Sequence, residues 1–215
     1  MTLQEYVDSL KGRRIAVLGI GVSNTPLIDL LLKNELPLTV CDMRSEEALG
    51  DTAAQLRARG AELRLGPGYL DDLEGFDYIF RTPGLLPIDP SLVAAKERGA
   101  VVTSEMEVFF QLCPCRTIGI TGSDGKTTTS SIIAELLKAA GLRVHLGGNI
   151  GKPLLTEIPD FRPEDIAVLE LSSFQLHSIN IRPDVAVVTN VSPNHLDKHP
   201  DFDDYVNAKR QIFAN

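Results

Sequence analysis

The sequence predicts an α/β fold with one parallel sheet in each of two successive domains. Short apolar runs alternate with amphipathic helical patterns along the 215 residues, which is typical of parallel strands covered by helices on both faces. The pattern also restarts in mid-chain, where a new apolar run leads into a glycine-rich loop. We therefore predict a first domain over residues 1–112 and a second domain over residues 113–215.

The first domain is predicted to open with a strand at Arg14–Gly19 and a helix at Pro26–Lys33, whose leucines share one helical face. Its other predicted elements are strands within residues 36–42, 75–84 and 100–105 and a helix over residues 89–99. In such sheets, ligands bind beyond the carboxyl ends of the strands. The polar residues that follow these strands are therefore candidate site residues.

The second domain is predicted to contain strands within residues 117–122, 142–148, 165–172 and 184–192. An amphipathic helix then begins near residue 203, and the sequence stops at Asn215. Because only four strand candidates follow the boundary and the last helix is cut short, we expect this domain to be truncated.

Composition excludes several classes of protein. The apolar fraction of 43% suffices for a core, and the formal charge of −8 argues against a nucleic-acid-binding protein. No apolar run is long enough to span a membrane, and the N-terminus lacks the pattern of a signal peptide. Three cysteines suit a reducing cytoplasm, and Cys113 and Cys115 lack the second pair that a metal site needs.

The stretch "TIGITGSDGKTTT" reads as a strand, a glycine loop and the start of a helix. Backbone amides in such a loop form an anion cradle, the Lys126 ammonium reaches terminal phosphates, and the Thr127 hydroxyl can ligate Mg²⁺. Only Ser123 and Asp124 separate the two glycines, whereas the usual phosphate loop has four intervening residues. Asp124 would repel phosphate, and we expect it to cap the helix instead.

The stretch "GIGVSN" predicts a Rossmann-like first domain with a nucleotide-like ligand. Gly19 and Gly21 fit a Gly-x-Gly turn, and Asp42 lies about twenty residues further on, where a ribose-binding acid belongs. Asn24 stands where the third glycine of a dinucleotide fingerprint would be, so the pattern disfavours NAD.

Two further polar residues follow predicted strands of the second domain. Glu170 ends "IAVLE", the position where phosphate-loop enzymes place an acid that serves Mg²⁺, although a plain surface acid remains an alternative. His195 follows "VAVVTN" and could ligate a metal or donate to an anion. The other histidines, His145, His177 and His199, are interpreted as ordinary solvated residues.

Taken together, these motifs resemble those of the Mur ligases, ATP-dependent enzymes that build the peptide of bacterial cell-wall precursors. The resemblance rests on "GITGSDGKTTT", "GGNIG", "ELSSFQL", "TNVSPNHLDKH" followed by "YVNAK", and, in the first domain, "GIGVSN" and "RTPGL". The motif "ELSSFQL" is most similar to the member that adds D-glutamate. Asn194 and Thr82 depart from the acid and the serine that are common in the family. Family members are about twice this length, so the resemblance implies that a C-terminal amino-acid-binding domain is absent.

The resemblance implies an activity and a set of site residues. UDP-N-acetylmuramoyl-L-alanine would be activated by ATP with Mg²⁺ and joined to D-glutamate through an acyl phosphate. The implied catalytic residues are Lys126, His195 and Lys209, and the implied metal ligands are Thr127, Glu170, His195 and a carbamylated Lys209. The implied ATP-phosphate site comprises Gly122, Ser123, Asp124, Gly125, Lys126, Thr127 and Thr128. The implied UDP-substrate site comprises Ser23, Asn24, Asp42, Arg44, Thr82, Gly84, Asn149, Ser172 and Gln175.

Three alternatives stay open at this point. A different Mur ligase or a folylpolyglutamate synthetase-like ligase would share the phosphate loop, although "SSFQL" and the short first domain favour the D-glutamate-adding member. An NAD-dependent reductase would use the first domain alone. A nucleotide-binding fragment without catalytic activity would fit a chain that lacks half of an enzyme.

For the favoured interpretation we expect a cytoplasmic monomer that neither binds nucleic acid nor inserts into membranes.

Overall fold

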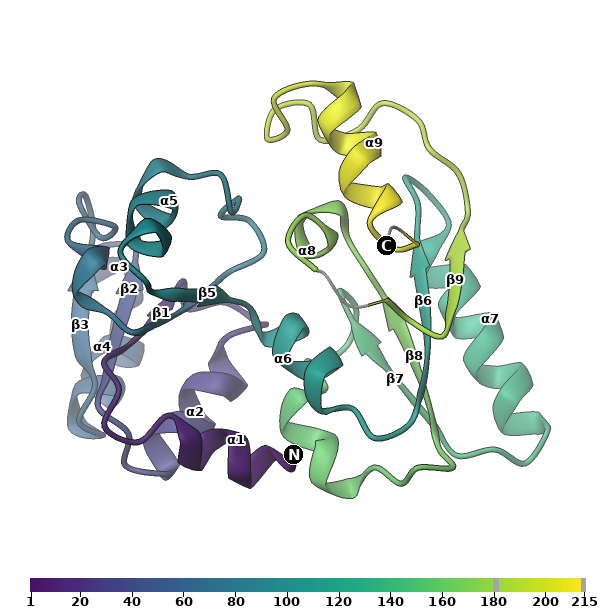
Figure 1. Cartoon of the computed structure of the whole chain (residues 1–215), viewed down its shortest axis with the longest axis horizontal. Helices are drawn as coiled ribbons and strands as arrows, with labels where there is room; N and C mark the ends of the chain where they lie inside the picture. Colours follow the sequence, from purple (N-terminus) through teal and green to yellow (C-terminus); the bar gives the residue numbers. More distant parts are fainter. Residues whose placement is uncertain (180–181, 214–215) are drawn as a thin grey trace. The chain divides into compact units, whose positions relative to one another are not determined.

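The computed structural model describes residues 1–179 and 182–213, and its chain divides into two compact units. The first unit is Met1–Glu105, and the second begins at Met106. Each unit contains one parallel sheet with helices packed against it (Figure 1). The α/β fold predicted from the alternating strand and helix patterns is therefore confirmed.

The first unit has a five-stranded parallel sheet in the order β3-β2-β1-β4-β5. Its strands are β1 (Ile15–Leu18), β2 (Leu38–Asp42), β3 (Glu62–Leu65), β4 (Tyr78–Arg81) and β5 (Val101–Thr103). Its helices are α1 (Leu3–Ser9), α2 (Thr25–Lys33), α3 (Glu46–Leu49), α4 (Asp51–Ala58), the 3₁₀ helix η1 (Leu73–Gly75) and α5 (Pro90–Glu97). The chain moves from β1 outward to one edge and then returns to place β4 on the other side of β1. Loops after β1 and β4 therefore meet at a topological switch point, where such sheets bind ligands.

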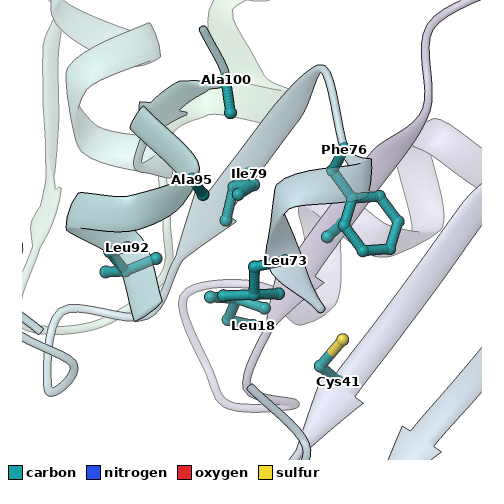
Figure 2. Close-up of a cluster of buried hydrophobic side chains, with 9 residues drawn as sticks. Leu18, Cys41, Leu73, Phe76, Ile79, Leu92, Ala95 and Ala100 are labelled. Carbon is teal, nitrogen blue, oxygen red and sulfur yellow. The ribbon is translucent and has the colours of Figure 1, made fainter. Parts of the chain in front are cut away.

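Both faces of this sheet are covered, as the unbroken apolar runs of its central strands require. All four residues of β1 are buried. Successive side chains of a strand point to opposite faces, so Ala16 and Leu18 lie on one face while Ile15 and Val17 lie on the other. Figure 2 shows the cluster on the first of these faces, where Leu18 meets Leu73 of η1 and Leu92 of α5.

The second unit has a four-stranded parallel sheet in the order β7-β8-β6-β9. Its strands are β6 (Arg116–Thr121), β7 (Val144–Gly148), β8 (Ile166–Glu170) and β9 (Val185–Val188). Its helices are α6 (Glu105–Leu112), α7 (Lys126–Ala139), the 3₁₀ helix η2 (Leu155–Asp160), α8 (Ser173–Leu176) and α9 (Phe202–Arg210). Helix α7 packs on the sheet through Ala134, which lies in a buried cluster with Ile120 of β6 and Val168 of β8. Strand β6 is central, so the loop that follows it lies beside the ends of β8 and β9.

The structure divides the chain earlier than the predicted domain end at residue 112. The difference is helix α6, which is placed almost entirely with the second unit. Phe109 on this helix is fully buried and makes an edge-to-face contact with Phe161, at a centroid distance of 6.1 Å. This long-range contact explains the shift, because a hydrophobic anchor of this kind leaves no sign in the local sequence pattern.

No helix in residues 1–179 or 182–213 is long and apolar enough to cross a membrane. The longest, α7, has 14 residues, whereas a spanning helix needs about 20.

Candidate functional site

The loop between β6 and α7 has the geometry of an anion-binding turn. Gly125 occupies the N-cap of α7 with a left-handed φ of 77°, so no side chain at that position can accept hydrogen bonds from the first helical amides. The amides of a first helical turn have no intrahelical acceptor, and the helix dipole adds partial positive charge there. The expectation that Asp124 caps this helix is wrong, because the N-cap falls one residue later and Asp124 is exposed.

Residues after β9 hold this loop in place. The Asn190 side chain accepts a hydrogen bond from the Asp124 amide and donates one to the Asp124 carbonyl, both at 3.0 Å. The buried Ser123 hydroxyl donates to the Ser192 carbonyl and accepts from the Ser192 amide, both at 2.9 Å. Gly122 has φ 152°, and a Cβ there would overlap the Thr189 hydroxyl. The loop is therefore preorganised before any ligand binds.

Two lysines converge on the same loop carbonyl. The Lys126 ammonium donates to the carbonyls of Gly122 at 3.0 Å and Ser123 at 2.9 Å. The Lys209 ammonium, on α9, donates to the same Gly122 carbonyl at 2.8 Å. Burial, together with the nearby charge of Lys126, lowers the pKa of Lys209 to about 8. Two ammonium groups at one carbonyl give this part of the loop a positive electrostatic potential, which favours binding of an anion.

Thr127 and Glu170 form the second half of this site. The Thr127 hydroxyl donates to one oxygen of the buried Glu170 carboxylate at 2.7 Å, and the Asn149 side chain donates to the other at 2.8 Å. The Asn149 backbone amide also donates to the Glu170 carbonyl at 2.7 Å. A Cβ on Gly148 would overlap that carbonyl, so β7 can approach β8 this closely only with glycine there. Asn149, which the sequence places in the UDP-substrate site, thus lies beside the acid.

This arrangement fits a nucleotide phosphate with a magnesium ion. The helix amides and the Lys126 ammonium are donors for phosphate oxygens. A hydroxyl and a carboxylate are the hard oxygen ligands that Mg²⁺ prefers. The space beside Gly125 is open, with no atom within 4 Å of a Cβ built there, so a ligand can approach its backbone.

The other predicted site residues of the second unit are His195, Ser172, Gln175 and Thr128, and their environments differ from that of Thr127 and Glu170. His195 is exposed, has a left-handed φ of 55° and contacts the Phe174 ring at a centroid distance of 5.4 Å. Ser172 and Gln175 form a capping box at the start of α8, in which the Ser172 amide donates to the Gln175 side chain at 3.0 Å. Thr128 is exposed in the first turn of α7. Of these side chains, those of His195 and Thr128 are exposed, whereas Gln175 is buried and paired with Ser172.

A separate site lies at the switch point of the first unit. The buried Asp42 carboxylate accepts hydrogen bonds from the Ile20 amide at 2.7 Å and from the Arg44 side chain at 2.8 and 2.9 Å. Burial alone would raise the pKa of Asp42, but these hydrogen bonds and the Arg44 charge outweigh it and lower the pKa to about 2. Arg44 also donates to the Ile20 carbonyl at 2.7 Å. Asp42 therefore stays ionised and fixes both the glycine turn and Arg44.

An open cavity of about 340 Å³ lies at this point. Asp42, Arg44 and Thr82 line it as predicted, and sequence reasoning missed Tyr69 and Leu85, which line it as well. Its full lining is Leu18, Gly19, Ile20, Gly21, Asp42, Met43, Arg44, Tyr69, Thr82 and Leu85. Tyr69 adds an aromatic ring to the lining of the cavity, which local periodicity could not have indicated.

Three other predicted residues of this unit, Ser23, Asn24 and Gly84, do not line the cavity. Asn24 is 1% exposed, and its side-chain amide donates to the carbonyls of Leu18 and Gly19 at 2.9 and 3.1 Å. Asn24 therefore shapes the turn after β1. The same turn brings Gly19 close to Thr82, because a Cβ added to Gly19 would lie 3.1 Å from Thr82 Cβ. Ser23 is half-buried and Gly84 is exposed.

The interpretation of three histidines as solvated residues is wrong. His145 stacks on Phe161 at 3.6 Å between ring centroids and forms a 2.8 Å hydrogen bond with Asp165. His199 is 2% exposed, and both it and the half-buried His177 contact Asp204. The carboxylates that pair with His145 and His177 lie 20 and 27 residues away in sequence, so the local sequence does not indicate those contacts. Asp204 is five residues from His199, but the Ser173 hydroxyl that also contacts His199 is 26 residues away.

Comparison with known proteins identifies both units. The Mur ligase middle domain matches residues 120–215, and the MurD-like N-terminal domain of Mur ligases matches residues 13–104. The chain belongs to the Mur ligase family. The two matches place the phosphate loop in a Mur ligase middle domain and the Asp42 site in a Mur ligase N-terminal domain.

Curated relatives give a closer comparison. The chain is 50% identical over 212 residues to a UDP-N-acetylmuramoylalanine--D-glutamate ligase of Clostridium novyi, covering 99% of this chain and 46% of that one. It is 51% identical to the ligase of the same name from Acetivibrio thermocellus, covering 98% of this chain and 45% of that one. This Mur ligase chain thus spans about half the length of the curated relatives that it matches.

A solved structure shows the same fold. The ligase for UDP-N-acetylmuramate and L-alanyl-γ-D-glutamyl-meso-diaminopimelate from Neisseria meningitides aligns with a TM-score of 0.53 at 20% identity, covering 93% of this chain and 67% of that one. This identity supports the fold alone.

Proposed function

We propose that this chain is the N-terminal and middle part of an ATP-dependent ligase that adds D-glutamate to UDP-N-acetylmuramoyl-L-alanine during cytoplasmic synthesis of peptidoglycan precursors. The observation that carries the proposal is the phosphate loop, where Lys126 and Lys209 converge on the Gly122 carbonyl and the next helical residue, Thr127, contacts Glu170. The relatives named above, at about 50% identity, support the choice of substrate.

The proposed reaction joins a carboxylate to an amine, and a carboxylate is a poor acyl donor. Phosphoryl transfer from ATP to the alanyl carboxylate gives an acyl phosphate, which the D-glutamate amine then attacks, releasing ADP and phosphate. The helix amides and Lys126 hold and neutralise the ATP phosphates. Thr127 and Glu170 present oxygen ligands for Mg²⁺, which when bound would neutralise charge on the transferring phosphoryl group.

Lys209 is proposed to act as a carbamate. Its neutral amine would attack carbon dioxide, forming a new N–C bond and releasing one proton. With a pKa of about 8, roughly a quarter of the amines would be neutral near pH 7.5, far more than for a solvated lysine. The product, a carbamate, is an anionic oxygen ligand beside Lys126. The carbamate replaces one of the two adjacent cations with an anion.

The first unit is proposed to bind the uridine nucleotide, with Asp42 at the position of a ribose-binding acid. We expect UDP to bind this chain at least about 10-fold more tightly than NADH, because the third glycine of a dinucleotide fingerprint is absent. Calorimetry with both nucleotides measures this. Arg44→Ala should weaken UDP binding by about 10-fold, the loss of one charge-assisted hydrogen bond.

Arg57→Ala is the matched control for that experiment. Arg57 also forms an exposed ion pair, at 2.7 Å from Glu46, but it lies outside the lining of the cavity. Its UDP affinity should stay within about twofold of that of the unchanged chain. Tighter binding of NADH than of UDP would contradict the uridine assignment, even if Arg44→Ala weakened both ligands.

The proposed ligation is tested by comparing the complete gene product with this chain alone. The complete protein should release phosphate and form the D-glutamate adduct, measured by mass, only when ATP, Mg²⁺ and both substrates are present. This chain alone should form no adduct, because holding an amine against an acyl phosphate can supply about 7–11 kcal/mol and these two units are proposed to lack that binding site. An adduct made by this chain alone would disprove that division of roles.

A further inference from the structure

A cluster of metal-ligating side chains lies between α8 and α9, outside the phosphate loop. The His177 Nε2 atom lies 3.0 Å from one oxygen of Asp204, and the His199 Nδ1 atom lies 2.6 Å from the other. The three ligand atoms all lie within 4.8 Å of one another. Helices α8 and α9 contact each other directly and can be followed in Figure 1. The cluster has no assigned role in the reaction proposed above.

The donor set suits a zinc-type ion. Two imidazole nitrogens and one carboxylate oxygen, completed by water, form a tetrahedral set that zinc accepts. Metal–ligand bonds of about 2.0–2.2 Å place tetrahedral ligands roughly 3.4 Å apart, so modest side-chain rotation would close this cluster around an ion. Nitrogen donors favour zinc, copper or nickel over magnesium, which separates this cluster from the oxygen ligands at Thr127 and Glu170.

The surroundings of the cluster also fit a metal site. The Ser173 hydroxyl lies 2.9 Å from His199 Nε2, the ring atom that faces away from Asp204. When Ser173 accepts a hydrogen bond from Nε2–H, Nδ1 carries no proton and directs its lone pair at the carboxylate, an arrangement that a cation stabilises. The Phe174 ring stacks on His199 at 5.0 Å and shields it from water. The Asp204 side chain is 24% exposed, which leaves access for an ion and a water ligand.

We propose that His177, His199 and Asp204 bind a zinc-type divalent ion that links α8 to α9. The ion would hold the helix that carries Lys209 against the helix that begins at the "SSFQL" motif. The proposal concerns residues of this chain alone and does not depend on the ligase assignment.

The test uses this chain with Cys113→Ser and Cys115→Ser as the parent, because these two thiols lie 3.6 Å apart and could bind zinc themselves. Millimolar Mg²⁺ is included to occupy the phosphate-loop site. Titration with Co²⁺, followed by its visible absorption, and calorimetry with Zn²⁺ should show one equivalent bound with micromolar or tighter affinity and a tetrahedral cobalt spectrum. Saturation at 100 times the dissociation constant should raise the melting temperature by about 5 °C or more.

Variants decide whether these residues are the ligands. Asp204→Asn and His177→Gln should each weaken Zn²⁺ binding by at least about 10-fold and remove the melting shift. His145→Gln is the matched control, because His145 pairs with Asp165 at 2.8 Å but belongs to no three-ligand cluster among residues 1–179 and 182–213. It should bind Zn²⁺ within about twofold of the parent. Circular dichroism confirms that each variant is folded.

Three results would overturn the proposal. The parent could fail to bind Zn²⁺ or Co²⁺ at micromolar concentration, which would leave a hydrogen-bonded His–Asp–His network only. Asp204→Asn and His177→Gln could bind as tightly as the parent. His145→Gln could lose affinity as much as they do, which would indicate non-specific binding by surface imidazoles.

Discussion

Replacing Lys126 with alanine in the complete gene product is expected to abolish ligation while leaving binding of the UDP-linked substrate unchanged. The Lys126 ammonium lies at the phosphate loop, 3.0 and 2.9 Å from two loop carbonyls, whereas the proposed uridine site belongs to the first unit. Removing one cation from a phosphoryl-transfer site should lower kcat by about 10³-fold or more. Phosphate release and product mass measure the reaction, and calorimetry measures substrate binding.

Lys138→Ala is the matched control for this experiment. Lys138 lies at the other end of α7, in an exposed ion pair with Glu135 at 2.9 Å, so its loss should change kcat by less than about twofold. Lys126→Arg should restore little activity, because a planar guanidinium does not fill the position of a compact ammonium. Equal loss of UDP-substrate affinity and of kcat in Lys126→Ala would show that the two-site assignment is wrong.

Replacing Lys209 with methionine is expected to stabilise the fold and to abolish ligation. Lys209 is 3% exposed, and burial lowers its pKa from 10.5 to about 8, so at neutral pH the folded state carries an unfavourable buried charge. The shift corresponds to about 3 kcal/mol of stability lost by the native chain at pH 7. Methionine removes that cost, and urea unfolding in CO₂-free buffer measures the gain.

The pH dependence of the difference in unfolding free energy between Lys209→Met and the native chain shows whether the buried charge causes it. Between pH 8 and 10.5 the unfolded state binds more protons at Lys209 than the folded state does, so the native chain gains stability as the pH rises through this window. The advantage of Lys209→Met should therefore shrink between pH 7 and pH 10. Lys138→Met, at an exposed site, should change stability by less than about 0.5 kcal/mol at either pH.

Bicarbonate provides the companion measurement for Lys209. ¹³C-labelled bicarbonate should give a carbamate resonance in the native chain that Lys209→Met lacks. A variant that is less stable than the native chain at every pH would contradict the buried-charge argument. A carbamate signal that persists in Lys209→Met would contradict the assignment of the carbamate to this lysine.

Local sequence was sufficient to place the elements that carry the two candidate sites. The run "TIGITG" followed by Lys126 and an amphipathic stretch predicted β6, the glycine loop and α7, because each depends on neighbouring residues only. Strand β3 was missed because it is a four-residue edge strand in which no residue is fully buried, so its pattern is too short to stand out. The first unit ends earlier than predicted because Phe109 packs on Phe161, fifty-two residues away in sequence.

The sequence by itself determined the α/β class and the glycine loop between β6 and α7, since strand runs, helical periodicity and glycine turns are properties of adjacent residues. Only the tertiary structure decided which side chains share a site. Asn149 reaches Glu170 because the parallel strands β7 and β8 bring their carboxyl ends to one edge of the sheet. Lys209 reaches the Gly122 carbonyl because α9 places its buried side chain against the loop that follows β6. His177, His199 and Asp204 meet because α8 packs on α9, and burial of the Lys209 amine lowers its pKa. Packing and desolvation act through space, so no local pattern could have indicated them.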